Sequence, residues 1–346
     1  MPYYDQREQR ETVYHAGNGF YSPYIEPEWK KERRKIRGAG NGIGLASLGY
    51  LAFTFGIAVV FMLIFEVYGM ITGVKIDFLE NEIIFWSYTI FTSIVSLLVP
   101  FAIYALFVKI PVSVALPFRK MPADLAIGGI LVGLGVTVIA SYATEYLALV
   151  LETIGIGITA PEIEMPVSVA GKILYAAALT VIPAFVEEIC FRGIVMQSLR
   201  RFGDIFALVA SALIFGIFHL NLVQMPYAFI MGLCIGYFVM RTGSLWVGIL
   251  IHFINNSMVV LLEFFVFDKS DEVQTAVNLV INIISVIVAI GAVVFLLRRY
   301  KDMFRFGKAP GVLSPGKKTV YFIFAPVLVV ALIGAFIMTL EYVYII

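Results

Sequence analysis

The sequence predicts an all-α fold, a polytopic membrane helix bundle of about eight to nine transmembrane helices with a cytoplasmic N-terminus. Composition is the first reason. Of the 346 residues, 60% are hydrophobic and only 14% are charged, whereas soluble domains are nearer half apolar and a quarter charged. The other two reasons are a series of long apolar segments and a clustering of positive charge in alternate loops.

Nine apolar segments approach the length that a transmembrane helix needs, which is about 20 residues for a hydrocarbon core of roughly 30 Å. Two of them, 205–220 and 223–240, are short and are joined by a tight link around Asn221. They are either two crossings or a helical hairpin that does not cross fully. The nine segments are 43–70, 83–108, 124–152, 168–199, 205–220, 223–240, 245–267, 274–297 and 319–341.

Loop charges indicate the orientation, because Lys and Arg favour the cytoplasmic side. If the segments alternate, the basic run KKERRKIR at 30–37 and the other basic loops all fall on one side, and the acidic loops fall on the other. The resulting organisation is a polar and basic cytoplasmic tail (1–40), a membrane bundle (41–298), a cytoplasmic linker (299–318) and a C-terminal transmembrane helix (319–346). The small size and short loops favour a multi-pass protein of a bacterial plasma membrane.

Clustered charge and cysteine content are more informative than the net charge. The net charge of +1 by itself says nothing about nucleic acid or acidic partners. We expect no nucleic-acid partner, and the basic run at 30–37 is expected to contact anionic membrane lipid. The two cysteines, Cys190 and Cys234, both lie in apolar segments, which argues against a disulfide framework and against a cysteine-rich metal site.

The stretch FVEEICFRG, residues 185–193, places three ionisable side chains inside an apolar segment. Each costs about 2.5–3.5 kcal/mol on insertion scales. Glu188 and Arg192 are four residues apart, so they share a helix face and can pair, whereas Glu187 points about 100° away. A paired carboxylate is a poor base, so Glu187 is the better candidate for a general base and Glu188 for a structural role.

Two other apolar segments carry polar residues at a similar depth. His219 ends FGIFH (215–219), and His252 and Asn256 lie four apart in HFINN (252–256), where they can donate two hydrogen bonds to a developing oxyanion. Counted inward at 1.5 Å per residue, Glu187 lies roughly 20 Å deep, His219 roughly 22 Å, and the His252–Asn256 pair roughly 12 to 18 Å. The agreement predicts one shared site.

Other polar residues in apolar segments are interpreted more simply. Asn255 is expected to hydrogen-bond between helices, as amides in membrane helices do. Glu145 and Glu263 lie near predicted helix ends and are given no function. Cys190 is expected to pack, because an apolar setting does not favour a thiolate.

The ordered motifs carry a family resemblance. EEICFR, FGIFH and HFINN, on successive apolar segments, resemble the three motifs of the CAAX protease and bacteriocin-processing family. Its members are intramembrane glutamic endopeptidases that include the Ras-converting CAAX endopeptidase. The motifs span 185–256, and the similarity is expected to cover about 168–267.

The resemblance implies a mechanism and a set of partners. Glu187 and His219 would activate a water molecule, His252 and Asn256 would stabilise the oxyanion, and Glu188 and Arg192 would support the site. The enzyme would use no metal and no organic cofactor. Its substrate would be a membrane-associated protein or peptide that reaches a cavity open to the cytoplasmic leaflet.

Two alternatives remain open from the sequence. Glu187, His219 and His252 with one water would satisfy a catalytic zinc, although the sequence lacks His-Glu-x-x-His. A non-enzymatic protein could use the same residues as a transporter or proton relay, or the chain could be a bacteriocin-immunity scaffold. The sequence selects no particular substrate.

Overall fold

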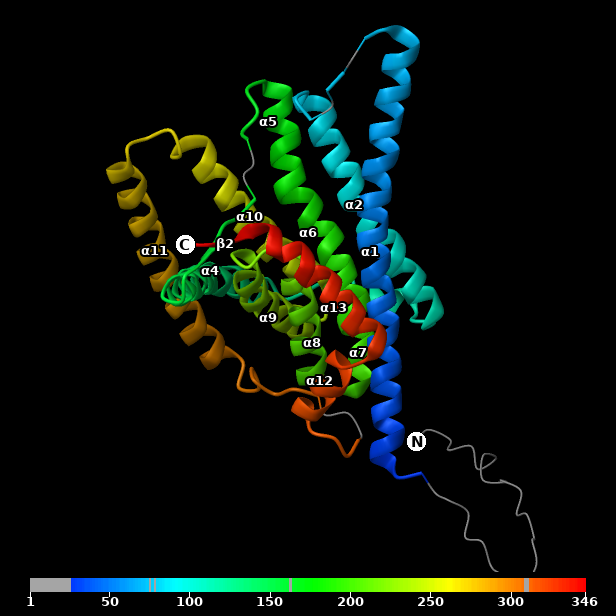
Figure 1. The fold of residues 1–346 in the computed structure, drawn as a ribbon. Coiled ribbons are helices and arrows are strands. Elements are labelled where there is room, and N and C mark those ends of the chain that lie inside the picture. Colours follow the sequence, from blue (N-terminus) through cyan, green and yellow to red (C-terminus); the bar gives the residue numbers. More distant parts are fainter. Residues whose placement is uncertain (1–25, 75, 78, 162–163, 308–310) are drawn as a thin grey trace, which may run out of the picture.

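A computed structural model describes residues 26–74, 76–77, 79–161, 164–307 and 311–346. The predicted tail (1–40) and linker (299–318) therefore lie partly outside the described residues. The predicted all-α membrane bundle is confirmed (Figure 1). Among the described residues, seven helices are long and apolar enough to cross a membrane, or eight if one bent pair counts as a span.

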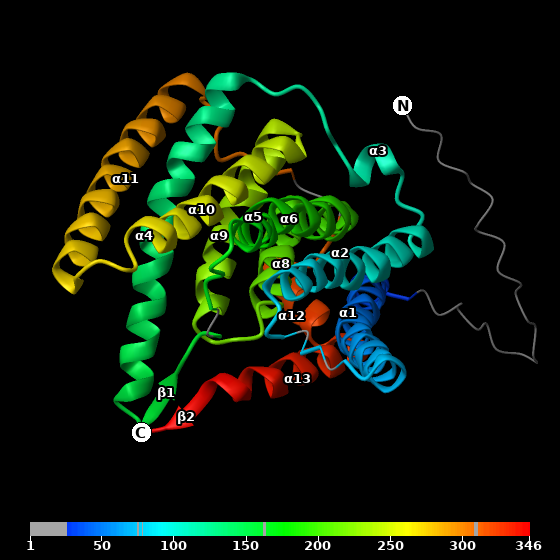
Figure 2. The same cartoon turned by 90° about the horizontal axis from the view of Figure 1, so that it is seen from above.

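The seven spanning helices include one composite helix, Val169–Phe202, which joins several shorter elements end to end. Viewed from above, α11 and α4 lie on one flank, α1 and α2 lie on the other, and the composite helix, α8, α9 and α10 fill the space between them (Figure 2). The other six spans are α1 (Glu28–Thr72), α2 (Glu82–Phe107), α4 (Ala123–Glu152), α9 (Gln224–Thr242), α10 (Leu245–Phe265) and α11 (Asp271–Arg299).

The count of nine crossings is corrected at α8 (Asp204–Ile217), which has 14 residues. At 1.5 Å per residue it reaches about 21 Å, short of a hydrocarbon core of about 30 Å. It packs along α9, so α8 is the short arm of a helical hairpin whose other arm, α9, is long enough to cross. The chain approaches α8 through Arg200 and leaves α9 through Arg241, so the assignment of basic loops to one side does not depend on how deep the hairpin reaches.

The predicted single helix over 319–341 is wrong. The chain forms α12 (Pro315–Ile323) and α13 (Pro326–Thr339), which are bent by 71°. Pro326 lacks an N–H and disfavours the helical conformation of the residue before it, and Ala325 is indeed extended, with φ −72° and ψ 128°.

A small antiparallel sheet was not predicted. After α13, strand β2 (Val343–Ile345) pairs with β1 (Ile156–Ile158), which follows α4. Strands of three residues carry too short a pattern to stand out between apolar helices. The remaining short helix, α3 (Val112–Ala115), lies in the loop between α2 and α4.

The composite helix contains two π-helical stretches. It runs through α5 (Val169–Ala176), a π stretch at Ala177–Val181, α6 (Ile182–Glu187), a second π stretch at Glu188–Val195 and α7 (Met196–Leu199), and it ends in a 3₁₀ turn at Arg200–Phe202. Such π segments inside helices occur frequently at functional sites. The second one begins between the two adjacent glutamates.

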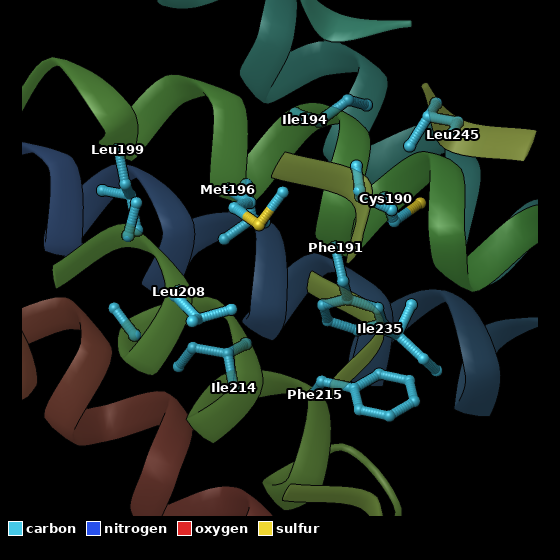
Figure 3. Packing of buried hydrophobic residues seen from close by; sticks show 14 of the residues in the cluster. Cys190, Phe191, Ile194, Met196, Leu199, Leu208, Ile214, Phe215, Ile235 and Leu245 are labelled. Atoms are coloured by element: carbon cyan, nitrogen blue, oxygen red, sulfur yellow. The ribbon is translucent and has the colours of Figure 1, made fainter. Parts of the chain in front are cut away.

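The part of the composite helix that follows these glutamates, toward the basic loop at Arg200, packs into a large buried hydrophobic cluster. Phe191, Met196 and Leu199 of the composite helix are at most 1% exposed and belong to the same buried cluster as Leu208 and Ile235 of α8 and α9. Figure 3 shows these side chains gathered between the helices. The composite helix is therefore held rigidly below the site.

Candidate functional site

Glu188 lies at the centre of a buried polar cluster. Its Oε1 accepts a hydrogen bond from Arg192 Nη1 at 2.8 Å, so the predicted ion pair is present, with side chains at most 1% exposed. The same oxygen lies 3.0 Å from Nδ1 of His252 on α10. A single carboxylate thus neutralises the guanidinium in its own helix and orients the imidazole of another helix.

The close approach of α10 to Glu188 depends on Gly248. A Cβ at this position would lie 2.9 Å from Glu188 Oε2 and 2.7 Å from Val239 Cγ2. Gly248 is one turn before His252 on the same helix face. A glycine is therefore required there for His252 to reach the carboxylate.

Glu187 lies beside this cluster but is not hydrogen-bonded into it. Its Oε2 is 3.9 Å from His252 Nε2, which is beyond hydrogen-bond distance. That oxygen is buried and has no hydrogen-bond partner among the described residues. As the helical spacing predicted, the two adjacent glutamates differ: Glu188 is paired and Glu187 is not.

His219 follows the end of α8 in a tight turn. Its Nδ1 lies 2.9 Å from the carbonyl oxygen of Phe215, so a proton on Nδ1 satisfies that carbonyl and leaves Nε2 unprotonated as an acceptor. The next residue, Leu220, has φ of +55°, and Asn221 Nδ2 donates to the His219 carbonyl at 2.9 Å. Non-glycine residues with positive φ cluster at functional sites.

The ring of Phe215 contacts Arg192, His219 and His252. These contacts give a structural reason for the phenylalanine in the Phe-x-x-x-His motif. The Arg192 guanidinium lies over its ring, 3.9 Å from the centroid, in a cation–π contact. The rings of His219 and His252 lie nearly perpendicular to the same Phe215 ring, with centroids 5.0 and 5.9 Å away. Phe215 therefore separates and orients the three basic groups.

Two hydrogen bonds, one to Leu179 and one from Asn255, position the side chain of Asn256. Its Nδ2 donates at 2.9 Å to the carbonyl of Leu179, which lacks its usual i→i−4 donor because Pro183 has no N–H. Its Oδ1 accepts from Asn255 Nδ2 at 3.1 Å. An amide nitrogen carries two hydrogens, so one N–H of Asn256 remains for a further acceptor.

Asn255 makes the contacts between helices that the sequence predicted. Its Oδ1 accepts from Thr137 of α4 and from Tyr227 of α9, both at 2.7 Å. Asn255 in turn fixes the amide of Asn256. The hydroxyls of Thr137 and Tyr227 thus help to orient the Asn256 amide through Asn255.

Two cavities meet at Glu187 and His219, and both residues line both of them. One, of about 310 Å³, lies toward α1 and α2 and is lined by many hydroxyl side chains. Those side chains are Tyr50, Thr54, Tyr88, Thr89, Thr92, Ser93 and Ser96. The other, of about 300 Å³, lies toward α9 and α10 and includes His252, Asn255 and Asn256.

The cavities extend in a direction that we had not expected. Tyr88 lines the first near the start of α2, and Glu263 lines the second near the end of α10. Both helix ends adjoin acidic loops, which lie at the top in Figure 1. The sequence predicts an opening toward the basic, cytoplasmic side, where Met196 and Leu199 are fully buried instead.

Sequence reasoning missed several residues of this site. Thr137 and Tyr227 are ordinary residues of apolar helices, and no spacing rule connects them to Asn255 on another helix. Thr92 has a buried hydroxyl without a described partner. The Ser and Thr residues at 89, 92, 93 and 96 share one face of α2, and this spacing was the available sequence signal for a hydroxyl-lined cavity. Glu263 was dismissed because it lies near a helix end.

Within the part of the chain that the structure describes, no three His, Cys, Asp or Glu side chains are grouped closely enough to hold a metal ion. The set Glu187, His219 and His252 is therefore not arranged as a zinc site in this conformation.

Comparison with known proteins places these motifs in a family. Residues 169–258 match the family model described as type II CAAX prenyl endopeptidase Rce1-like. This segment contains all three motifs and confirms the resemblance drawn from them. No curated protein and no solved structure matches the chain significantly.

Proposed function

Because residues 169–258 belong to the type II CAAX prenyl endopeptidase Rce1-like family, we propose that this multi-pass membrane protein is an intramembrane endopeptidase that cleaves a membrane-associated protein or peptide. One observation carries the assignment beyond the family. Glu187, His219, His252 and Asn256 come from three separate helical segments and line one cavity. We place the protein in a bacterial plasma membrane with its basic loops in the cytoplasm.

The nucleophile is a water molecule held between Glu187 and His219. Oε2 of Glu187 has no described hydrogen-bond partner, Nε2 of His219 is left as an acceptor, and both residues line the cavities; a water with two hydrogens would satisfy both. Glu187 takes one proton as the water oxygen attacks the peptide carbonyl, and it then returns that proton to the leaving amine. Each proton is accounted for without a covalent intermediate.

The oxyanion is stabilised from α10. Nε2 of His252 points toward Glu187 across 3.9 Å, and the second N–H of Asn256 is free, so both can donate to the oxygen that becomes negative. Donation by His252 to the oxyanion requires a hydrogen on Nε2, while Glu188 holds the imidazole through Nδ1.

Glu188 and Arg192 act through His252. Their ion pair is buried and within hydrogen-bond distance, and Glu188 holds the imidazole through Nδ1. A fixed donor loses no orientational freedom when the transition state forms. We therefore assign these two residues a positioning role.

The test is comparative peptidomics of membranes that contain the wild-type protein, Glu187→Ala or His219→Ala. We expect one or more cleavage products to disappear in both variants, while the purified variants keep the thermal unfolding profile of the wild type. Glu145→Ala is the matched control, because Glu145 is an exposed carboxylate on α4 that lines neither cavity. Full cleavage by purified Glu187→Ala would refute the assignment.

A further inference from the structure

Glu263 is a carboxylate in the second cavity that the proposed mechanism does not use. It lies on the spanning helix α10, is partly buried and lines the same cavity as Glu187 and His252. Tyr175 of α5 donates a hydrogen bond to its Oε2. An ionisable residue within a membrane span is costly and by default has a functional partner, and one neutral hydroxyl does not neutralise a carboxylate.

The charged residues that line this cavity indicate which kind of group could pair with Glu263. Its described lining residues include two carboxylates, Glu187 and Glu263, and none of them is Lys or Arg. A ligand carrying a free carboxylate would meet two carboxylates there and no Lys or Arg side chain among the described lining residues. A ligand with a positive charge near Glu263 would complete an ion pair in a setting where water competes poorly.

The distance between Glu263 and the reacting groups sets where that charge must lie. Glu263 is eleven residues after His252 on one helix, which corresponds to about 16 Å at 1.5 Å per residue. An extended peptide advances about 3.3 Å per residue. A substrate that lies along α10 with its scissile bond at His252 would thus bring a side chain about five residues away next to Glu263.

We propose that Glu263 binds the cationic side chain of a Lys or Arg located about five residues from the hydrolysed bond of the substrate. The proposal rests on the peptidase function proposed above and adds a substrate class to it. Tyr175 holds the Glu263 carboxylate in place through Oε2, and Oε1 is left for the cation. The side of the bond on which the basic residue lies follows from the direction in which the chain binds.

The alternative is that the Tyr175–Glu263 contact only ties α5 to α10. The variant Glu263→Gln separates the two, because an amide oxygen still accepts from the Tyr175 hydroxyl while the charge is lost. Glu263→Lys reverses the charge. Glu145→Gln is the matched control, since it removes an exposed carboxylate from α4, outside both cavities.

The experiment uses the purified full chain in liposomes with a library of synthetic N-palmitoylated peptides that carry Lys, Arg, Ala or Glu at every position. Cleaved bonds are identified by mass spectrometry, and products that also form with Glu187→Ala are subtracted. In the wild type we expect Lys or Arg to be favoured over Glu by roughly 10-fold or more at a position four to six residues from the bond, as for a hydrogen bond to a charged group.

The variants decide the outcome. Glu263→Gln should lose the preference for Lys or Arg and still cut the Ala peptides at the wild-type rate. Glu263→Lys should instead favour Glu at that position. The control, Glu145→Gln, should behave as the wild type. Glu187-dependent cleavage without a basic preference, or a preference that survives in Glu263→Gln, overturns this inference and leaves the peptidase assignment intact. If the wild-type protein cuts no peptide in the library, the peptidase assignment fails and this inference fails with it.

Discussion

Nδ1 of His252 lies 3.0 Å from Oε1 of Glu188, the same oxygen that accepts from Arg192 at 2.8 Å. One carboxylate oxygen thus joins a cation in its own helix to an imidazole on α10. The adjacent Glu187 shares none of these hydrogen bonds and keeps a buried oxygen without a described partner. Neighbouring residues of identical chemistry therefore have opposite roles.

The two glutamates should differ in their effect on stability. Glu188→Ala leaves the buried Arg192 without its counter-ion, so we expect a loss of about 3–5 kcal/mol in the free energy of unfolding, together with a loss of activity. Glu187→Ala should change the unfolding free energy by less than about 1 kcal/mol and still abolish cleavage. Thermal and denaturant unfolding in the same detergent provide the comparison. Equal destabilisation by both would contradict the division of roles.

Gly248→Ala should disturb the site without replacing any of its polar residues. The added Cβ would lie 2.9 Å from Glu188 Oε2 and 2.7 Å from Val239 Cγ2, so α10 must shift, at a cost of about 1–3 kcal/mol. Because His252 moves with α10, kcat should fall as well. Gly291→Ala on α11 is the control, since its Cβ meets nothing within 4 Å. A Gly248→Ala enzyme with wild-type kcat would show that the approach of α10 is not critical.

Tyr227→Phe tests the hydrogen bonds that position Asn256. It removes one of the two donors to Asn255 Oδ1, which is worth about 1 kcal/mol. If that energy orients Asn256 in the transition state, kcat should fall about five-fold while KM stays constant. Tyr104→Phe is a matched control, because that buried hydroxyl contacts Ser198 away from the site. A change in KM alone would instead place Tyr227 in substrate binding.

Thr92→Val tests whether the hydroxyl-lined cavity holds the water that reacts. The Thr92 hydroxyl is buried, lacks a described partner and lines the cavity that Glu187 also lines. Replacing it with a methyl group should leave the unfolding free energy unchanged or raise it by about 1 kcal/mol, while kcat falls. Thr339→Val on α13 removes a buried hydroxyl far from the site and should leave kcat unchanged. Wild-type kcat in Thr92→Val would argue against a water role for this cavity.

Chelation separates direct water attack from a zinc mechanism. If Glu187 and His219 activate water by themselves, cleavage should survive prolonged treatment with 1,10-phenanthroline, and the purified enzyme should contain zinc well below one equivalent. Elemental analysis and a cleavage assay on the same sample make the measurement. Activity that is lost on chelation and restored by added zinc would support the metal alternative and refute the proposed mechanism.

Several features of the fold followed from local sequence alone. Apolar length identified the spanning helices, because each must satisfy its backbone hydrogen bonds within itself in lipid. The bend between α12 and α13 was missed because apolar composition continues through it, although Pro326 was the available signal. The β1–β2 pairing was missed because three-residue strands depend on a partner nearly 190 residues away in the sequence.

The sequence by itself determined the polar residues of the three motifs and which of them share a helix face. Spacing of four residues on a helix pairs Glu188 with Arg192 and turns Glu187 away from them, since adjacent side chains on a helix diverge by about 100°. The same spacing groups His252 with Asn256. These are local consequences of helix geometry, so they hold wherever the helices are placed.

Only the tertiary structure decided how these residues contact one another and what else joins them. The sequence holds no information on helix packing that would bring His252 to Glu188, or Thr137 and Tyr227 to Asn255, because each contact links different helices. The two cavities arise for the same reason: they are spaces left between packed helices, and side chains of the buried hydrophobic cluster such as Phe191 and Ile235 form part of their walls. Only the packing of the helices therefore showed that Glu263 lines the second cavity, because its position on its own helix gave no reason to expect a function.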